Sequence, residues 1–265
     1  MEDKFVFKKK YGQNFLKDQN TIARIANIVG LTKEDFVIEV GPGAGSLTKD
    51  LAVRAKNVLC YEIDKTLEKI LTENLKSYNN ISILYQDFLK ADLKADSKNY
   101  HYKNLYFVSN VPYYITTPIL FKLISSSLYF QKIVMMVQKE VGDRFCASKG
   151  KKEYGALTVL LNYYFDTKKE FFVSRNQFYP IPKVDSVVVS FTPKENRENL
   201  KNEAFFIKLV HDSFQFKRKT IRNNLKNYNL EKVESVLKKY HYDLSTRAEN
   251  IEYNVFVDLA NSLYE

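Results

Sequence analysis

The sequence is poor in the residues that disulfide frameworks and zinc sites require. It contains only two cysteines, Cys60 and Cys146, in 265 residues. Neither cysteine has the close spacing to a second ligand that is typical of a metal site. We therefore expect no structural zinc and no other metal, and we expect reduced thiols of the kind found in the cytoplasm.

Long apolar stretches are also missing from the chain. No run approaches the roughly 20 apolar residues that a membrane-spanning helix needs. The opening residues, "MEDKFVFKKKYGQNF", lack the apolar segment of a signal peptide. These absences predict a cytoplasmic protein that does not act at a membrane.

Positive charge and aromatic residues, by contrast, are abundant. The chain carries 41 Lys and Arg against 31 Asp and Glu, a net charge of +10, together with 19 Tyr and 19 Phe. Such a composition favours a polyanionic partner whose bases can stack on aromatic rings. A compositional bias of the genome would give the same totals, so composition alone does not decide between the two explanations.

Strand and helix patterns alternate along the first part of the chain. Apolar runs of strand length are followed by amphipathic helical segments, which indicates a parallel sheet with helices on both faces. Beyond the polar segment Lys194–Asn202, every strong pattern is helical. The sequence predicts an α/β domain over residues 1–195 and a small all-helical domain over residues 196–265.

A glycine loop follows the first strand of this predicted sheet. In "EVGPGAGSLT", glycines stand at 41, 43 and 45, and the third position of the dinucleotide fingerprint is not a glycine. Glu39 precedes the loop, and a carboxylate beside a helix N-terminus would repel a pyrophosphate. A cofactor that carries an ammonium and a sulfonium suits this carboxylate. We therefore expect Glu39, Gly41 and Gly43 to bind S-adenosylmethionine.

Two further carboxylates end the next two predicted strands. Glu62, which is followed by Ile63, could accept hydrogen bonds from both ribose hydroxyls. Asp87 could accept one from the adenine amino group, with Phe88 packed nearby. Ligands of open α/β sheets bind at the carboxyl ends of the strands. We therefore favour one shared cofactor site over separate solvated strand caps.

The tetrapeptide Asn110-Val111-Pro112-Tyr113 ends the fourth predicted strand. The Asn110 side-chain oxygen and the Val111 carbonyl could accept hydrogen bonds from an adenine N6 amine and draw it towards tetrahedral geometry. Pro112 would stiffen the turn, and Tyr113 could stack on the base. No strong base is needed, because the methyl donor is already activated and catalysis rests on positioning.

This tetrapeptide resembles the Asn-(Leu/Ile)-Pro-Tyr motif of the ribosomal RNA adenine dimethyltransferases, with Val at the second position. Seven further segments resemble the family in the same order along nearly the whole chain. They are "QNFL", "EVGPGAGSLT", "YEID", "QDFL", "QKEVGDRF", "FYPIPKVDSVVVSF" and "FKRKTIRNNL". The resemblance implies a Rossmann-like S-adenosylmethionine-dependent methyltransferase sheet with a small all-helical C-terminal domain.

The resemblance also implies roles for single residues. Asn14, Leu16, Gly41, Glu62, Asp87 and Asn110 should contact S-adenosylmethionine or its adenosine half. Phe178 resembles the second aromatic wall of the target-base pocket, although burial in a core is the ordinary fate of a phenylalanine.

Three functions within this resemblance compete. The first is transfer of methyl groups to the N6 amines of two adjacent adenosines in the loop of the 3′-terminal hairpin of 16S rRNA, within the small ribosomal subunit. The second is methylation of 23S rRNA in macrolide resistance, and the third is a ribosome-assembly factor that acts by binding. Asp185 in "PKVDSVVV" favours the first, because the resistance enzymes usually resemble Pro-Lys-Val-Asn-Ser. We expect a monomer with a role in small-subunit biogenesis.

Two basic segments are candidates for holding the RNA. "QFKRKTIRNNLK" is expected to form a helix from about Arg218, which would place Arg218, Arg222 and Lys226 on one face. A solvated basic face is the alternative explanation. "SKGKKEYG" would add a mobile basic loop beside the active site. The predicted RNA-binding residues are Lys149, Lys151, Lys152, Lys217, Arg218, Lys219 and Arg222.

Overall fold

The computed structural model describes residues 14–264, which form two compact units. The first unit runs to Gly142 and includes Lys168–Thr192. The second contains Asp143–Thr167 and the chain from Pro193 onward. The predicted domain of residues 1–195 had included Asp143–Thr167. In the structure this segment carries a helix that packs against C-terminal helices, so it belongs to the second unit.

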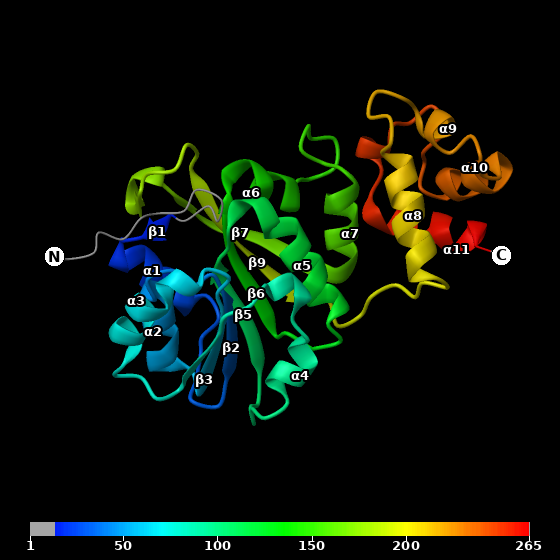
Figure 1. Ribbon diagram of the computed structural model, residues 1–265. Helices are drawn as coiled ribbons and strands as arrows, with labels where there is room; N and C mark the ends of the chain where they lie inside the picture. Colours follow the sequence, from blue (N-terminus) through cyan, green and yellow to red (C-terminus); the bar gives the residue numbers. More distant parts are fainter. Residues whose placement is uncertain (1–13, 265) are drawn as a thin grey trace. The chain divides into compact units, whose positions relative to one another are not determined.

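A seven-stranded sheet has the order β4-β3-β2-β5-β6-β9-β7 (Figure 1). Neighbouring strands from β4 to β6 are parallel, and β9 is antiparallel to β6. This confirms the predicted α/β class. Every residue of β2 is buried, as expected of a strand covered on both faces. The strands are β2 (Phe36–Val40), β3 (Asn57–Tyr61), β4 (Ile81–Leu84), β5 (Leu105–Asn110), β6 (Lys132–Gln138), β7 (Phe165–Val173) and β9 (Ser186–Pro193).

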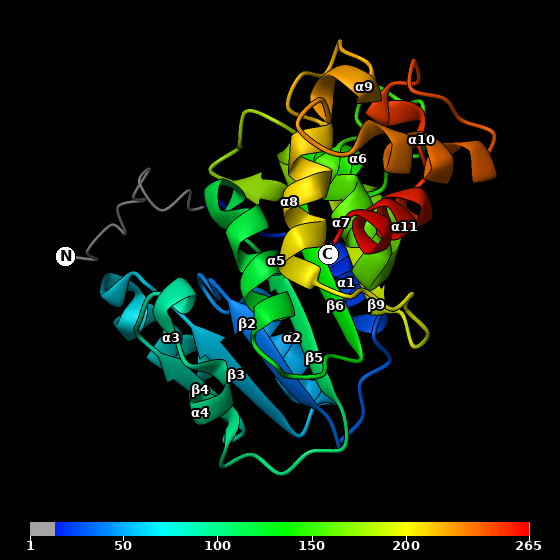
Figure 2. The same cartoon turned by 90° about the vertical axis from the view of Figure 1, so that its right-hand side faces the viewer.

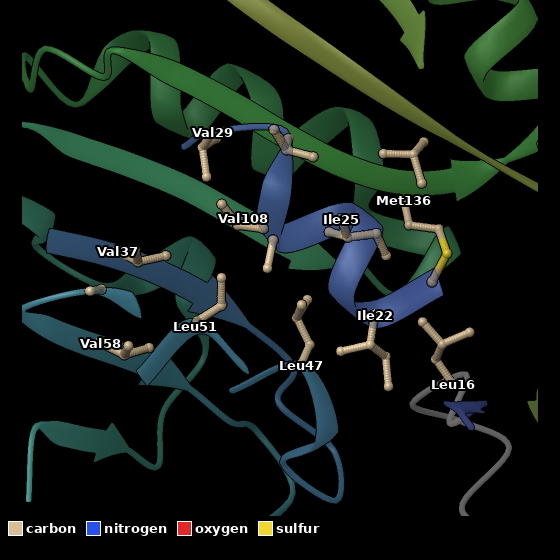
Figure 3. Packing of buried hydrophobic residues seen from close by; sticks show 14 of the residues in the cluster. Leu16, Ile22, Ile25, Val29, Val37, Leu47, Leu51, Val58, Val108 and Met136 are labelled. Atoms are coloured by element: carbon tan, nitrogen blue, oxygen red, sulfur yellow. The ribbon is translucent and has the colours of Figure 1, made fainter. Parts of the chain in front are cut away.

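Helices α1 (Gln19–Asn27) and α2 (Ser46–Arg54) cover one face of the sheet. Figure 3 shows their apolar side chains meeting those of the strands in one buried cluster. Residues of this cluster include Ile22, Ile25, Leu47, Leu51, Val37, Val58, Val108 and Met136. Asp18 caps the start of α1, because its carboxylate accepts a hydrogen bond of 2.7 Å from the Thr21 N–H.

Aromatic residues pack on the opposite face. Phe36 stacks on Tyr100 with ring centroids 4.4 Å apart, and Phe88 lies edge-on to Tyr61 at 5.2 Å. The Tyr61 hydroxyl donates to Asp96 at 2.9 Å, which ties β3 to a short helix on this side. The remaining helices of the first unit are α3 (Glu68–Leu75), α4 (Leu93–Ser97) and α5 (Thr116–Ser125), and α6 (Lys139–Phe145) crosses into the second.

The direction of the chain through the sheet reverses beside β2. From β2 it moves outward to β3 and β4, and it then returns to β5 on the other side of β2. The carboxyl ends of β2 and β5 therefore flank a topological switch point, where open α/β sheets bind their ligands. A separate two-stranded ladder pairs β1 (Phe15–Leu16) with β8 (Phe178–Tyr179).

The second unit is helical, which confirms the prediction for the C-terminal region. Helix α7 packs against α8 and α11, and α10 packs against α11 (Figure 2). The bounds are α7 (Ala156–Tyr164), α8 (Glu203–Ser213), α9 (Ile221–Asn224), α10 (Leu230–Lys239) and α11 (Tyr253–Leu263). None of the helices within residues 14–264 has both the length and the apolar character needed to cross a membrane.

The predicted basic helix from Arg218 is wrong, because α9 spans only Ile221–Asn224. The side chain of Asn224 explains the difference. It accepts a hydrogen bond from the Phe216 N–H (3.1 Å) and donates to the carbonyls of Ser213 (2.7 Å) and Phe216 (3.3 Å). In a helix the backbone groups of Ser213 and Phe216 would bond to other backbone groups, whereas here the Asn224 side chain bonds to them and holds a turn. Arg218 therefore lies ahead of α9 and does not share a helix face with Arg222.

Candidate active site

One cavity of the first unit opens at the carboxyl ends of β2, β3, β4 and β5. Its walls bring together every predicted cofactor residue and the predicted catalytic tetrapeptide, although these come from segments far apart in the sequence. The predicted residues that line it are Asn14, Leu16, Glu39, Gly41, Gly43, Glu62, Ile63, Asp87, Phe88, Asn110, Val111, Pro112 and Tyr113.

The glycine loop can approach a ligand because its three glycines, Gly41, Gly43 and Gly45, adopt backbone conformations that other residues avoid. Gly41 and Gly43 have φ angles of +70° and +60°. A Cβ atom on Gly43 would lie 2.9 Å from the ring of Phe15, closer than packed carbon atoms tolerate. The loop therefore depends on the absence of a side chain at Gly43, where the ring of Phe15, which lines the same cavity, comes close.

Two buried carboxylates line this cavity. Glu39 and Glu62 are 1% and 5% exposed, and within residues 14–264 neither forms an ion pair. An unpaired buried carboxylate is costly. A ligand with two positive groups would relieve that cost, whereas a pyrophosphate would increase it. The donor set therefore fits S-adenosylmethionine.

Burial also changes the acidity of these groups. It raises the pKa of Glu39 to about 7, although the Cys60 thiol donates a hydrogen bond to the carboxylate at 3.6 Å. Burial likewise raises the pKa of Glu62, against the effect of backbone N–H donors that include Asp64 at 2.8 Å. The two carboxylates also repel each other, and Glu62 contributes to the raised pKa of Glu39.

Asp87 and Phe88 lie where the third parallel strand ends. One oxygen of Asp87 accepts a hydrogen bond from the Leu89 N–H at 3.0 Å, and within residues 14–264 no hydrogen bond engages the other. Phe88 is 3% exposed and packs on Tyr61 beneath the cavity. One carboxylate oxygen of Asp87 thus caps the turn, as the alternative of a strand cap expects. The residue also lines the cavity.

A buried serine fixes the position of Asn110. The backbone ladder between β2 and β5 ends at the pair Ile38 and Phe107. Beyond it, the Ser109 hydroxyl donates to the Val40 carbonyl at 2.6 Å and accepts from the Val40 N–H at 3.3 Å. Within residues 14–264 no hydrogen bond engages the side-chain amide of Asn110, so its oxygen can serve a ligand.

A second serine, which sequence reasoning missed, holds Tyr113. The Tyr113 hydroxyl lies 2.7 Å from the hydroxyl of Ser186, which is fully buried at the start of β9. Burial raises the pKa of the Tyr113 phenol, so it stays neutral and able to donate. The two residues are 73 positions apart, and the only sequence signal was that Ser186 belongs to the segment "PKVDSVVV".

The predicted aromatic wall, Phe178, is placed differently from the other catalytic candidates. It is 2% exposed and lies in the hydrophobic cluster, paired with Leu16 through the β1–β8 ladder. It is not among the residues that line the cavity, whereas Tyr114, which is 54% exposed, is among them. The packed position agrees with the core alternative, and a role of Phe178 beside the target base stays a prediction.

The predicted RNA-binding residues all lie in the second unit. Lys149 pairs with Glu252 at 2.5 Å, and the Gly150 N–H donates to the Glu249 carbonyl at 2.7 Å. The Lys217 ammonium donates to the Lys152 carbonyl at 2.5 Å. These bonds bring the two basic segments, which are 65 residues apart, to one surface of the helical unit.

Residues 4–265 of the chain match the family described as ribosomal RNA adenine dimethylase. The chain belongs to this family. It is 42% identical over 98% of its length to the ribosomal RNA small subunit methyltransferase A of Bacillus licheniformis, of which 92% is covered. It is 43% identical over 97% of its length to the protein of the same name from Pediococcus pentosaceus, of which 89% is covered.

Solved structures agree with this membership. A dimethyladenosine transferase from Plasmodium falciparum superposes with a TM-score of 0.76 at 28% identity, over 92% of this chain and 95% of that one. The 23S rRNA methyltransferase ErmE gives 0.75 at 29% identity, over 94% and 99%. The protein is therefore an S-adenosylmethionine-dependent rRNA adenine dimethyltransferase, and the predicted cofactor and enzyme class are confirmed.

Proposed function

We propose that this enzyme dimethylates the N6 amines of two adjacent adenosines in the loop of the 3′-terminal hairpin of 16S rRNA. The choice of 16S rRNA as the target rests on the sequence identity of 42–43%, over nearly the whole chain, to proteins named ribosomal RNA small subunit methyltransferase A. The match to ErmE, at 29% identity, supports the shared fold and the shared chemistry on adenine more than a 23S target.

The chain's own residues would bind and orient the two reactants. S-adenosylmethionine supplies an activated methyl group. Glu39 and Glu62 provide negative charge in a buried setting, and the glycine loop lets the ligand approach the backbone. Asp87 offers a carboxylate oxygen for an adenine amino group.

Asn110 and Val111 would act on the target amine. Their oxygens would accept its two hydrogens out of the plane of the base, which localises the nitrogen lone pair for attack. Pro112 limits the motion of this turn. Tyr113, held through its hydroxyl by Ser186, would present its ring to the base. Such catalysis depends on alignment more than on proton transfer.

The helical unit would hold the RNA through its basic surface, formed by Lys149, Lys151, Lys152, Lys217, Arg218, Lys219 and Arg222. Lys149 contributes least free charge, because it is paired with Glu252. We further propose that the enzyme works as a cytoplasmic monomer on the small ribosomal subunit and contributes to its biogenesis. The substrate named for its relatives supports this setting.

Mass mapping of ribosomal RNA tests the proposal. In a strain that lacks the gene, the 3′-terminal hairpin of 16S rRNA should lose four methyl groups, and the gene should restore them. An Asn110→Ala variant should lower methyl transfer by at least about 100-fold, the scale for loss of one well-placed polar group. Loss of methyl groups from 23S rRNA in place of 16S rRNA would contradict the assigned target.

A further inference from the structure

A large aromatic side chain is exposed in the middle of the basic surface of the helical unit. Phe216 is 55% exposed and is followed directly by Lys217, Arg218 and Lys219. A single exposed apolar residue is ordinary on a protein surface. The surroundings of Phe216, however, are not those of an ordinary solvated loop.

The backbone of Phe216 is held from two sides. Asn224, which is 9% exposed, accepts from the Phe216 N–H and donates to its carbonyl. The Lys219 N–H donates to the same carbonyl at 2.9 Å. The ring is therefore presented by a fixed turn, and a ligand that contacts it would not have to order the chain first.

The charges around the ring lack carboxylate partners within the described part of the chain. Among residues 14–264, no carboxylate pairs with Lys152, Lys217 or Arg218, although the Lys217 ammonium donates a hydrogen bond to the backbone carbonyl of Lys152. Like charges held together repel each other, and a polyanion would relieve the repulsion. An exposed ring among such cations matches the pattern by which proteins bind unpaired nucleotides, with phosphates on the cations and a base on the ring.

We infer that Phe216 is a stacking platform for one unpaired base of the ribosomal RNA, separate from the target adenosine. The inference rests on the proposed function, because it takes the ribosomal RNA as the polyanion. The ring would select a nucleotide that is not in a duplex, since only a splayed base offers its face. Phe216 would therefore contribute to where the RNA is held and not to methyl transfer itself.

A tryptophan reporter can test this contact directly, because the chain contains no tryptophan. In Phe216→Trp, stacking of a base on the indole should quench the emission when protein-free small-subunit rRNA is added. The matched control is Tyr129→Trp, since Tyr129 is 62% exposed in the first unit and precedes β6, away from the carboxyl ends. Its emission should not change. Quenching by intact subunits but not by the naked RNA would assign Phe216 to a ribosomal protein and overturn the inference.

Affinity measurements provide the second test. Phe216→Ala should weaken RNA binding by roughly 5- to 150-fold, the range for loss of one base stack on an aromatic ring. The slope of log affinity against log salt should stay unchanged, because no phosphate contact is lost. Phe216→Leu should be nearly as weak as the alanine variant, since it keeps apolar area but not the flat ring. Full affinity of the leucine variant would refute stacking.

Methyl transfer separates this inference from the function on which it rests. Phe216→Ala should raise the KM for RNA and leave the kcat unchanged at saturating RNA. If the wild-type enzyme methylates small-subunit rRNA while Phe216→Ala binds it normally, the stacking inference alone fails. If the wild-type enzyme does not methylate that RNA, the proposed function fails first.

Discussion

The hydrogen bond between Tyr113 and Ser186 gives the sharpest test of how the site works. Its two oxygens lie 2.7 Å apart, and Ser186 is fully buried. Ser186→Ala leaves the Tyr113 hydroxyl without its partner, and Tyr113→Phe leaves the serine without its own. Leaving a buried hydroxyl unsatisfied costs about 1–3 kcal/mol. If the whole of this cost is added to the activation free energy, because the Tyr113 ring is no longer aligned with the base, kcat falls by roughly 5- to 150-fold.

Single-turnover methyl transfer, with RNA and S-adenosylmethionine both saturating, measures this loss. The double variant should be little worse than either single variant, because both substitutions remove the same contact. Ser190→Ala is the matched control. The Ser190 hydroxyl also makes a bond of 2.7 Å on β9, but its acceptor is Glu170. It should lower the melting temperature without changing kcat. Fully additive effects of Tyr113→Phe and Ser186→Ala on kcat would refute the positioning role.

Three further predictions follow from burial, packing and charge. Because the pKa of Glu39 is raised to about 7, affinity for the cationic cofactor should fall as pH drops from 8 to 6, and calorimetry should show proton release at pH 6. A Glu39→Gln variant should show a smaller fall and less proton release, with the remainder from Glu62, whose pKa burial also raises. Gly142→Ala should lower the free energy of unfolding by at least about 1–3 kcal/mol in thermal denaturation, because its Cβ would lie 2.2 Å from a methyl group of Val187 on β9. Gly155→Ala is the control and should lower it less, because its Cβ would meet no atom within 4 Å. Replacing Arg218 and Arg222 by alanine should make the salt dependence of RNA binding shallower by roughly 1.5 to 2 units of slope, and an unchanged slope would assign them to a solvated surface.

The elements of the sheet could be predicted because their signals are local. The run "KIVMMVQ" has five consecutive apolar residues between Lys132 and Gln138, and it forms β6 over the same seven residues. The acids at the strand ends could be placed together for a related reason, since parallel strands bring their carboxyl ends to one edge. Glu39, Glu62 and Asp87 line one cavity for that reason.

Features that depend on distant contacts could not be predicted in this way. The segment "RKTIRNNLKNY" has a helical pattern, but the Asn224 side chain bonds the turn before it, and α9 begins only at Ile221. Helix α7 is apolar on most of its faces, so its sequence does not indicate which helices it packs against or that it belongs to the second unit. Ser186 carries no local sign that it holds Tyr113 from 73 residues away.

The electrostatics of the cavity explain why the glycine loop alone is an incomplete guide to the cofactor. A glycine loop at a helix N-terminus favours an anion, since its free N–H groups point outward. Here Glu39 and Glu62 place two carboxylates beside that loop, both buried and neither paired within residues 14–264. A dinucleotide would add two phosphate charges to this arrangement, whereas S-adenosylmethionine brings an ammonium and a sulfonium. If Glu39 and Glu62 bind the cofactor as proposed, their burial is better explained by binding than by stability.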